Sequence, residues 1–92
     1  MPKISYDSRF ENAYVKFTRR NRKRVEDIDR VFKIFASNPK HQSLRIEKLS
    51  GGAIWTIRID RGNRLFFIWS YEQDTAIFFF VGPHDSYRIV KK

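Results

Sequence analysis

The spacing of apolar residues changes at Asn38-Pro39, and this change constrains the fold more than any other feature of the chain. Before it, large apolar side chains recur every three or four residues, as on the buried face of a helix. After it, they alternate with polar residues or run together, as in β-strands. A helical half followed by a strand-rich half predicts an α+β domain with helices packed on one face of a sheet.

The first half is predicted to hold a short strand and a helical hairpin. Residues 4–6 alternate like a strand, and Asp7 or Ser8 is suited to cap the helix that follows. Asn21 interrupts the helical pattern, and the second helix is expected to stop at Asn38 because a residue before proline resists helical geometry. The apolar stripes of the two helices are Phe10, Ala13, Tyr14 and Phe17 on the first, and Val25, Ile28, Val31, Phe32 and Phe35 on the second.

The second half is predicted to form an antiparallel sheet. Residues 44–48 are a candidate strand, and stronger strand patterns follow at residues 55–60, 64–69 and 76–81. The unbroken apolar run at 76–81 is typical of a strand covered on both faces. Short turns make such strands antiparallel neighbours. We therefore expect residues 1–92 to form one domain of order β-α-α-β-β-β, with an N-terminal strand and an α-helical hairpin packed on an antiparallel β-sheet.

The composition excludes several classes of function. The absence of cysteine among the 92 residues excludes disulfide frameworks, zinc ribbons and thiol catalysis. No apolar run approaches the roughly 20 residues that span a bilayer, and the N-terminus lacks the apolar stretch of a signal peptide. We therefore expect a cytoplasmic protein with no membrane partner.

The positive charge makes nucleic acid the first partner to consider. Nineteen Lys and Arg residues against ten Asp and Glu give a net charge of +9, and neutralising phosphates releases counterions from a nucleic acid. Residues 16–24 contain six basic residues and no acid. Such a segment is either a solvated helix end or a patch that binds RNA backbone or an acidic partner protein. Charge alone does not separate these readings.

One constellation of residues is suited to RNA cleavage. Arg58 and Arg64 flank a four-residue turn, so their guanidinium groups are predicted to approach each other across a hairpin. His84 and Tyr87 follow the last strand and supply an imidazole and a phenol at the sheet edge. Arginine matches phosphate geometry, and histidine transfers protons near neutral pH. The alternative is that these are ordinary edge and turn residues. Neither a metal site nor a cofactor motif is expected, because His41 and His84 lie far apart without acidic companions.

Several short motifs carry a resemblance to a known family. They are Asn38-Pro39 and residues 44–51 (LRIEKLSG), 55–59 (WTIRI), 62–67 (GNRLFF) and 81–87 (VGPHDSY). In this order and spacing, the chain resembles the RelE/ParE superfamily of bacterial type II toxin–antitoxin toxins, and within it the RelE/HigB/YoeB-like mRNA interferases. The resemblance covers nearly the whole chain and implies a RelE/ParE-like fold.

The resemblance also implies roles for particular residues. Arg64 matches the arginine that stabilises the scissile phosphate, and Arg58 matches a basic position that orients the reacting groups. His84 is the implied general acid or base, and Tyr87 matches a tyrosine that stacks on or activates the substrate. Some relatives carry a glutamate base at a position where this chain has no acid, and Glu47 appears out of register, so His84 is the preferred base. The charged residues expected to contact RNA are Arg45, Lys48, Arg19, Arg20, Arg22, Lys23 and Arg24.

The function implied is a toxin that cleaves mRNA on the ribosome by attack of the RNA 2′-hydroxyl on the adjacent phosphate, without a cofactor. Its expected partners are the ribosome, mRNA and a cognate antitoxin, which would bind the aromatic surface of the sheet, neutralise the basic site and form a hetero-oligomer with the toxin. Two alternatives stay open. One is a ParE-like inhibitor that binds DNA gyrase without catalysis, and the other is a non-toxic relative that only binds RNA or a partner.

Overall fold

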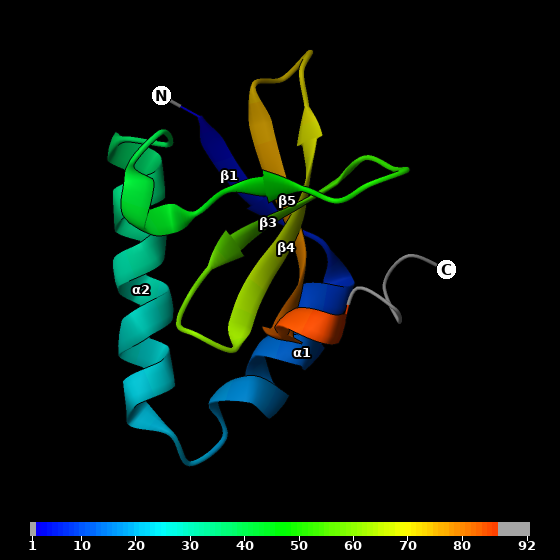
Figure 1. Ribbon diagram of the computed structural model, residues 1–92. Helices are drawn as coiled ribbons and strands as arrows, with labels where there is room; N and C mark the ends of the chain where they lie inside the picture. The colour runs from blue at the N-terminus through cyan, green and yellow to red at the C-terminus, as the bar shows by residue number, and fades with distance from the viewer. Residues whose placement is uncertain (1, 87–92) are drawn as a thin grey trace.

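A computed structural model describes residues 2–86 and places two helices against one five-stranded sheet (Figure 1). The chain runs through β1 (Lys3–Tyr6), α1 (Ser8–Thr18), α2 (Arg22–Ser37), β2 (Glu47–Lys48), β3 (Ile54–Arg58), β4 (Asn63–Ser70) and β5 (Thr75–Pro83). Two 3₁₀ turns complete the path, at Gln42–Leu44 and His84–Ser86. The predicted α+β class is confirmed, but four strands follow the helices where the predicted order β-α-α-β-β-β has three.

The first helix begins at one of its two predicted cap residues, and the second begins at Asn21, where the helical pattern was expected to be interrupted. The Asp7 side chain accepts a hydrogen bond from the backbone N–H of Arg9 at 2.8 Å, and the Asn21 side chain accepts one from the backbone N–H of Arg24 at 3.1 Å. These bonds satisfy N–H groups that have no partner within the first helical turn. The second helix ends at Ser37, directly before Asn38-Pro39, as the restriction on a residue before proline predicts.

The sheet is mixed, and this corrects the expectation of a fully antiparallel sheet. Its strand order is β1-β5-β4-β3-β2, and β2 to β5 pair antiparallel, but β1 pairs parallel with β5 at the edge. Parallel neighbours need a long crossover rather than a turn. Here the helical hairpin and the rest of the sheet lie between β1 and β5 in the chain.

The candidate strand at residues 44–48 is mostly not a strand. Only Glu47 and Lys48 pair with β3, whereas Gln42–Leu44 forms a 3₁₀ turn. Leu44 is completely buried, and Arg45 takes a left-handed backbone conformation with φ of 47°. Burial of Leu44 therefore interrupts the extended pattern that the alternation of Leu44, Ile46 and Lys48 indicated.

The core lies between the helices and one face of the sheet. Phe35 of α2 packs edge-on against Phe67 and Phe78, whose ring centroids lie 5.7 and 5.9 Å from its own. None of residues 76–81 is exposed, so the prediction that this strand is covered on both faces is confirmed. A β-bulge accommodates the run: Phe66 pairs with Phe80 but Phe67 pairs with Phe78, and one extra residue is inserted into β5.

Candidate functional site

Two arginines lie directly opposite each other on β3 and β4. Arg58 pairs with Arg64 at the end of the hairpin, next to the turn of residues 60–63. Ile57 and Leu65, their neighbours along the strands, are completely buried in the core beneath the helices. Because side chains alternate along a strand, the arginines project from the other face of the sheet. The sequence prediction that the hairpin brings these two residues together is confirmed.

The end of β5 lies beside Arg64, so that Arg58, Arg64 and Gly82 form a row across three neighbouring strands. Gly82 pairs with Arg64, and a side-chain Cβ at Gly82 would lie only 2.9 Å from the Phe80 ring. Two residues later, His84 begins the last 3₁₀ turn, and its backbone N–H donates a hydrogen bond to the carbonyl oxygen of Gly62 at 2.8 Å. His84 is exposed. The backbone thus anchors the histidine segment to the turn that precedes Arg64.

The Arg64 guanidinium is partly buried and held by backbone. Its Nη1 donates to the carbonyl oxygens of Asp60 and Asn63, both at 3.0 Å. Burial and the positive charge of Arg58 lower the pKa of Arg64, while the negative charges of Glu47 and Asp60 act in the opposite direction. Two like charges close together at the end of a hairpin favour the binding of an anion between them. The pair is therefore a suitable phosphate-binding site.

Glu47 is the residue that sequence reasoning missed. The comparison with relatives that carry a glutamate base placed Glu47 out of register, but β2 pairs Glu47 with Thr56, which lies two residues from Arg58 on the same face. Its charge also acts on Arg64. The signal that could have revealed it is the polar Glu47-Lys48 pair directly before the Ser50-Gly51 turn, which allows a short antiparallel strand.

Lys48 and Arg45, which were also predicted to contact RNA, lie apart from this row. The register places Lys48 on the face opposite Arg58, where its Nζ lies 5.9 Å from the Trp55 ring centroid. Arg45 is exposed beside the 3₁₀ turn at Gln42–Leu44. Tyr87 lies outside the described residues, so the part predicted for it stays a prediction.

The basic segment of residues 16–24 divides into two groups. Arg19 and Arg20 are exposed in the connection between the helices and take part in none of the ion pairs found within residues 2–86. Lys23 instead binds the buried Asp27 at 2.7 Å. Arg24 donates to the carbonyl oxygen of Phe17 at 2.9 Å, and its guanidinium stacks over the ring of that residue.

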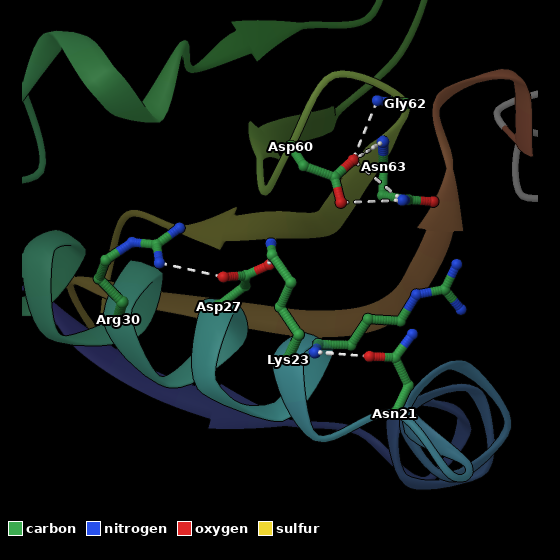
Figure 2. A network of polar contacts seen from close by, with 8 residues as sticks. Asn21, Lys23, Asp27, Arg30, Asp60, Gly62 and Asn63 are labelled. Carbon is green, nitrogen blue, oxygen red and sulfur yellow. Dashed lines mark hydrogen bonds and ion pairs between the residues drawn. The ribbon is translucent and has the colours of Figure 1, made fainter.

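Asp27 forms ion pairs with two basic side chains of α2 (Figure 2). Its carboxylate is 5% exposed and binds Lys23 on one side and Arg30, at 3.0 Å, on the other. The hydrogen bond from Lys23 is the main reason that the pKa of Asp27 is lowered, with a contribution from Arg30. Arg22 also lies near an acid, Glu26, at 3.8 Å with both side chains largely exposed. The segment is therefore only partly available to an external partner.

The expected antitoxin surface needs a correction. The phenylalanines of the sheet do not form an exposed surface, because Phe66, Phe67, Phe78 and Phe79 are less than 5% exposed. Besides the exposed Tyr71 in the turn after β4, aromatic side chains line a groove of about 670 Å³ between the end of β1 and the two helices, which we call the hairpin groove. Its lining includes Tyr6, Phe10, Tyr14, Val25, Ile28 and Phe32.

Within residues 2–86, no three His, Asp or Glu side chains gather closely enough to hold a metal ion. Over the same stretch, neither helix combines the length and apolar character that crossing a membrane requires. The site that the structure presents is thus a pair of cations with a carboxylate and an imidazole at the same end of the sheet, a set that can bind a phosphodiester and transfer protons.

Known structures share this fold, although no protein-family profile matches the chain and no curated protein matches its sequence. The YoeB/ParE toxin from Agrobacterium tumefaciens superposes with a TM-score of 0.73 at 19% identity, covering 89% of this chain and 98% of that one. A chain of the E. coli DinJ-YafQ toxin-antitoxin complex gives 0.72 at 13% identity, covering 92% and 94%. A chain of the heterotetrameric YoeB-YefM toxin-antitoxin complex from Staphylococcus aureus gives 0.69 at 18% identity, covering 91% and 98%.

These likenesses span almost the full length of each chain and establish the fold. This chain has the fold of the YoeB and YafQ toxins, which confirms the RelE/ParE-like architecture that the sequence resemblance implied. A fold of this kind hosts more than one activity, so function has to be argued from the site.

Proposed function

We propose that this protein is the toxin of a type II toxin–antitoxin system and that it cleaves mRNA on the ribosome. The observation that carries the proposal is the row of Arg58, Arg64 and Gly82 across three strands, with Glu47 on the same face and His84 anchored beside it. The toxin fold of the structural neighbours supports the same conclusion.

The reaction needs no nucleophile from the protein, because the RNA 2′-hydroxyl attacks the adjacent phosphate. The oxygen–phosphorus bond to the 5′ oxygen breaks, which leaves a 2′,3′-cyclic phosphate and a free 5′-hydroxyl. Arg64 and Arg58 stabilise the charge that develops on the phosphate oxygens. A base must remove the 2′-hydroxyl proton, and an acid must protonate the leaving oxygen.

Two groups are available for these proton transfers. Glu47 accepts a proton in its ionised form, and the imidazolium form of His84 donates one. We assign Glu47 as the base and His84 as the acid. This changes the preference for His84 as base that the sequence favoured, because β2 brings Glu47 to the face of the two arginines. Tyr87 keeps the substrate-stacking role that the resemblance implies.

The antitoxin is the proposed protein partner. A chain of net charge +9 with a partly exposed arginine pair is complementary to an acidic segment of its partner. We assign the hairpin groove to apolar side chains of the same antitoxin, because four phenylalanines of β4 and β5 (Phe66, Phe67, Phe78 and Phe79) are buried. Val25→Glu in the groove should weaken antitoxin binding, whereas Val15→Glu on exposed α1 surface outside it should not.

The test of the proposed function is induced expression in bacteria followed by mapping of new 5′ ends in cellular mRNA. The wild type should arrest growth and produce cuts within translated messages, and Arg64→Ala should do neither. Arg61→Ala is the matched control, because it removes an exposed arginine from the same turn. Arrest with intact mRNA, DNA damage and altered supercoiling would instead support gyrase inhibition. No arrest by soluble wild-type protein would support a non-toxic relative.

A further inference from the structure

The turn of residues 60–63 between β3 and β4 is organised by one carboxylate (Figure 2). Oδ1 of Asp60 accepts hydrogen bonds from the backbone N–H groups of Gly62 and Asn63, both at 3.0 Å, and from the Asn63 side chain at 2.9 Å. Oδ2 accepts a further bond from that side chain at 3.1 Å. An aspartate that binds its own turn in this way restricts the backbone to one conformation.

The hydrogen bonds to Asp60 lower its pKa by more than burial raises it. Burial alone raises the pKa of Asp60, but the hydrogen bonds from Asn63 and Gly62 bring the pKa below its ordinary value. The ionised carboxylate is therefore the form that holds the turn together.

The backbone of this turn contacts Arg64, to which phosphate binding was assigned, and His84, to which proton transfer was assigned. The carbonyl oxygens of Asp60 and Asn63 accept from Nη1 of Arg64 at 3.0 Å each. Between them, the carbonyl oxygen of Gly62 accepts from the backbone N–H of His84 at 2.8 Å. Carbonyls of one short turn thus hold a side chain of β4 and the segment that follows β5.

We propose that Asp60 is a positioning residue, which sets the Arg64 guanidinium and the His84 segment relative to each other through the turn that its carboxylate organises. The inference rests on the proposed function, because it assigns Asp60 a part in that reaction without contact with the substrate. Because Nη1 of Arg64 donates to the turn, the orientation of the guanidinium is fixed, and its other N–H groups stay available to bind a phosphate. Displacement of a reacting group by about 1 Å can cost roughly 100-fold in rate.

The kinetic experiment compares Asp60→Ala, Asp60→Asn and the control Glu72→Ala in mRNA cleavage on purified ribosomes. Glu72 is exposed in the turn at the opposite end of β4. Asp60→Ala should lower kcat about 10- to 100-fold with KM changed less than about threefold, because orientation is lost rather than substrate binding. Asp60→Asn should recover most of kcat, because its side-chain oxygen still accepts from the N–H groups of Gly62 and Asn63. Glu72→Ala should match the wild type.

A double-mutant comparison shows whether Asp60 acts through Arg64. In an Arg64→Ala background, Asp60→Ala should cause a much smaller further loss than it does alone, because the group it positions is already missing. Independent, additive losses would contradict the proposal. So would an equal loss of kcat in Asp60→Asn and Asp60→Ala, or a rise in KM alone.

Amide hydrogen exchange tests the turn without any activity. In Asp60→Ala, the His84 amide should exchange faster, because its hydrogen bond to the carbonyl oxygen of Gly62 is weakened. The amides of β4 and β5 should stay protected, because the hydrogen bonds between these strands are unchanged. Unchanged exchange at His84 would overturn the proposal. If the wild type does not cleave mRNA, the proposed function fails, and the exchange result still decides whether Asp60 fixes this segment.

Discussion

The Arg58–Arg64 pair and the basic segment of residues 16–24 are both rich in positive charge, but they differ in what holds them. The pair is set by strand register, with Arg64 bound only to backbone carbonyls. In the segment, Lys23 is bound to a buried aspartate and Arg24 to the ring and carbonyl of a phenylalanine. The difference teaches that a run of charge in a sequence does not measure the charge available to a nucleic acid. Availability depends on whether the fold supplies internal partners.

The largest effect that would sharpen this comparison is expected at Arg64. Arg64→Ala should reduce the rate of mRNA cleavage on ribosomes about 10²- to 10³-fold, because it removes donors from the developing phosphate charge. The thermal melting temperature should change little relative to the Arg61→Ala control. Full cleavage activity in Arg64→Ala would show that the pair is not the reaction centre.

The next effect concerns the proton transfers. Glu47→Gln keeps the size of the side chain but removes the base, and it should lower single-turnover cleavage about 10²-fold. If Glu47→Gln is fully active while His84→Ala is inactive, the base is His84 and the assignment made from the structure is wrong.

A smaller effect separates the two groups within the basic segment. The double variant Arg19→Gln, Arg20→Asn should weaken ribosome binding about tenfold near physiological salt and reduce the salt dependence by about two units of slope. Asparagine is chosen at position 20 because Arg20 has a φ of 55°, which asparagine tolerates. The matched pair Lys23→Gln, Arg24→Gln should affect binding less. An equal loss of ribosome binding in both double variants would contradict the division of the basic segment into two groups.

The smallest effect is on stability and concerns the aspartate that binds Lys23. Asp27→Ala should lower the free energy of unfolding by about 1 to 2 kcal/mol, since charge-assisted bonds to two partly exposed partners are lost. The lowered pKa of Asp27 means that its contribution is present above the unfolded value of 3.8 and disappears as pH falls through the folded pKa. Urea unfolding at pH 7 and below pH 3 should therefore show a gap between wild type and variant that narrows in acid.

Much of the site could be read along the chain because it depends on local features. The turn between Arg58 and Arg64 is short, so the pairing of these two residues follows from its length. Glu47 was beyond such reasoning, because its place depends on how the two-residue strand β2 pairs with β3, and two residues are too few to show a strand pattern. Asp60 was missed for another reason: an aspartate near a glycine predicts a turn, but not which distant backbone groups that turn will bind.

The sequence by itself determined the helical hairpin, the helix ends, the three long strands and the α+β class, because periodicity, caps and proline act over a few residues. Only the tertiary structure decided that β1 lies parallel to β5 and that Glu47 joins the arginine face. It also decided that one turn holds both Arg64 and the His84 segment. These arrangements join residues far apart in the chain, and their geometry exists only after the core has brought the strands and helices together.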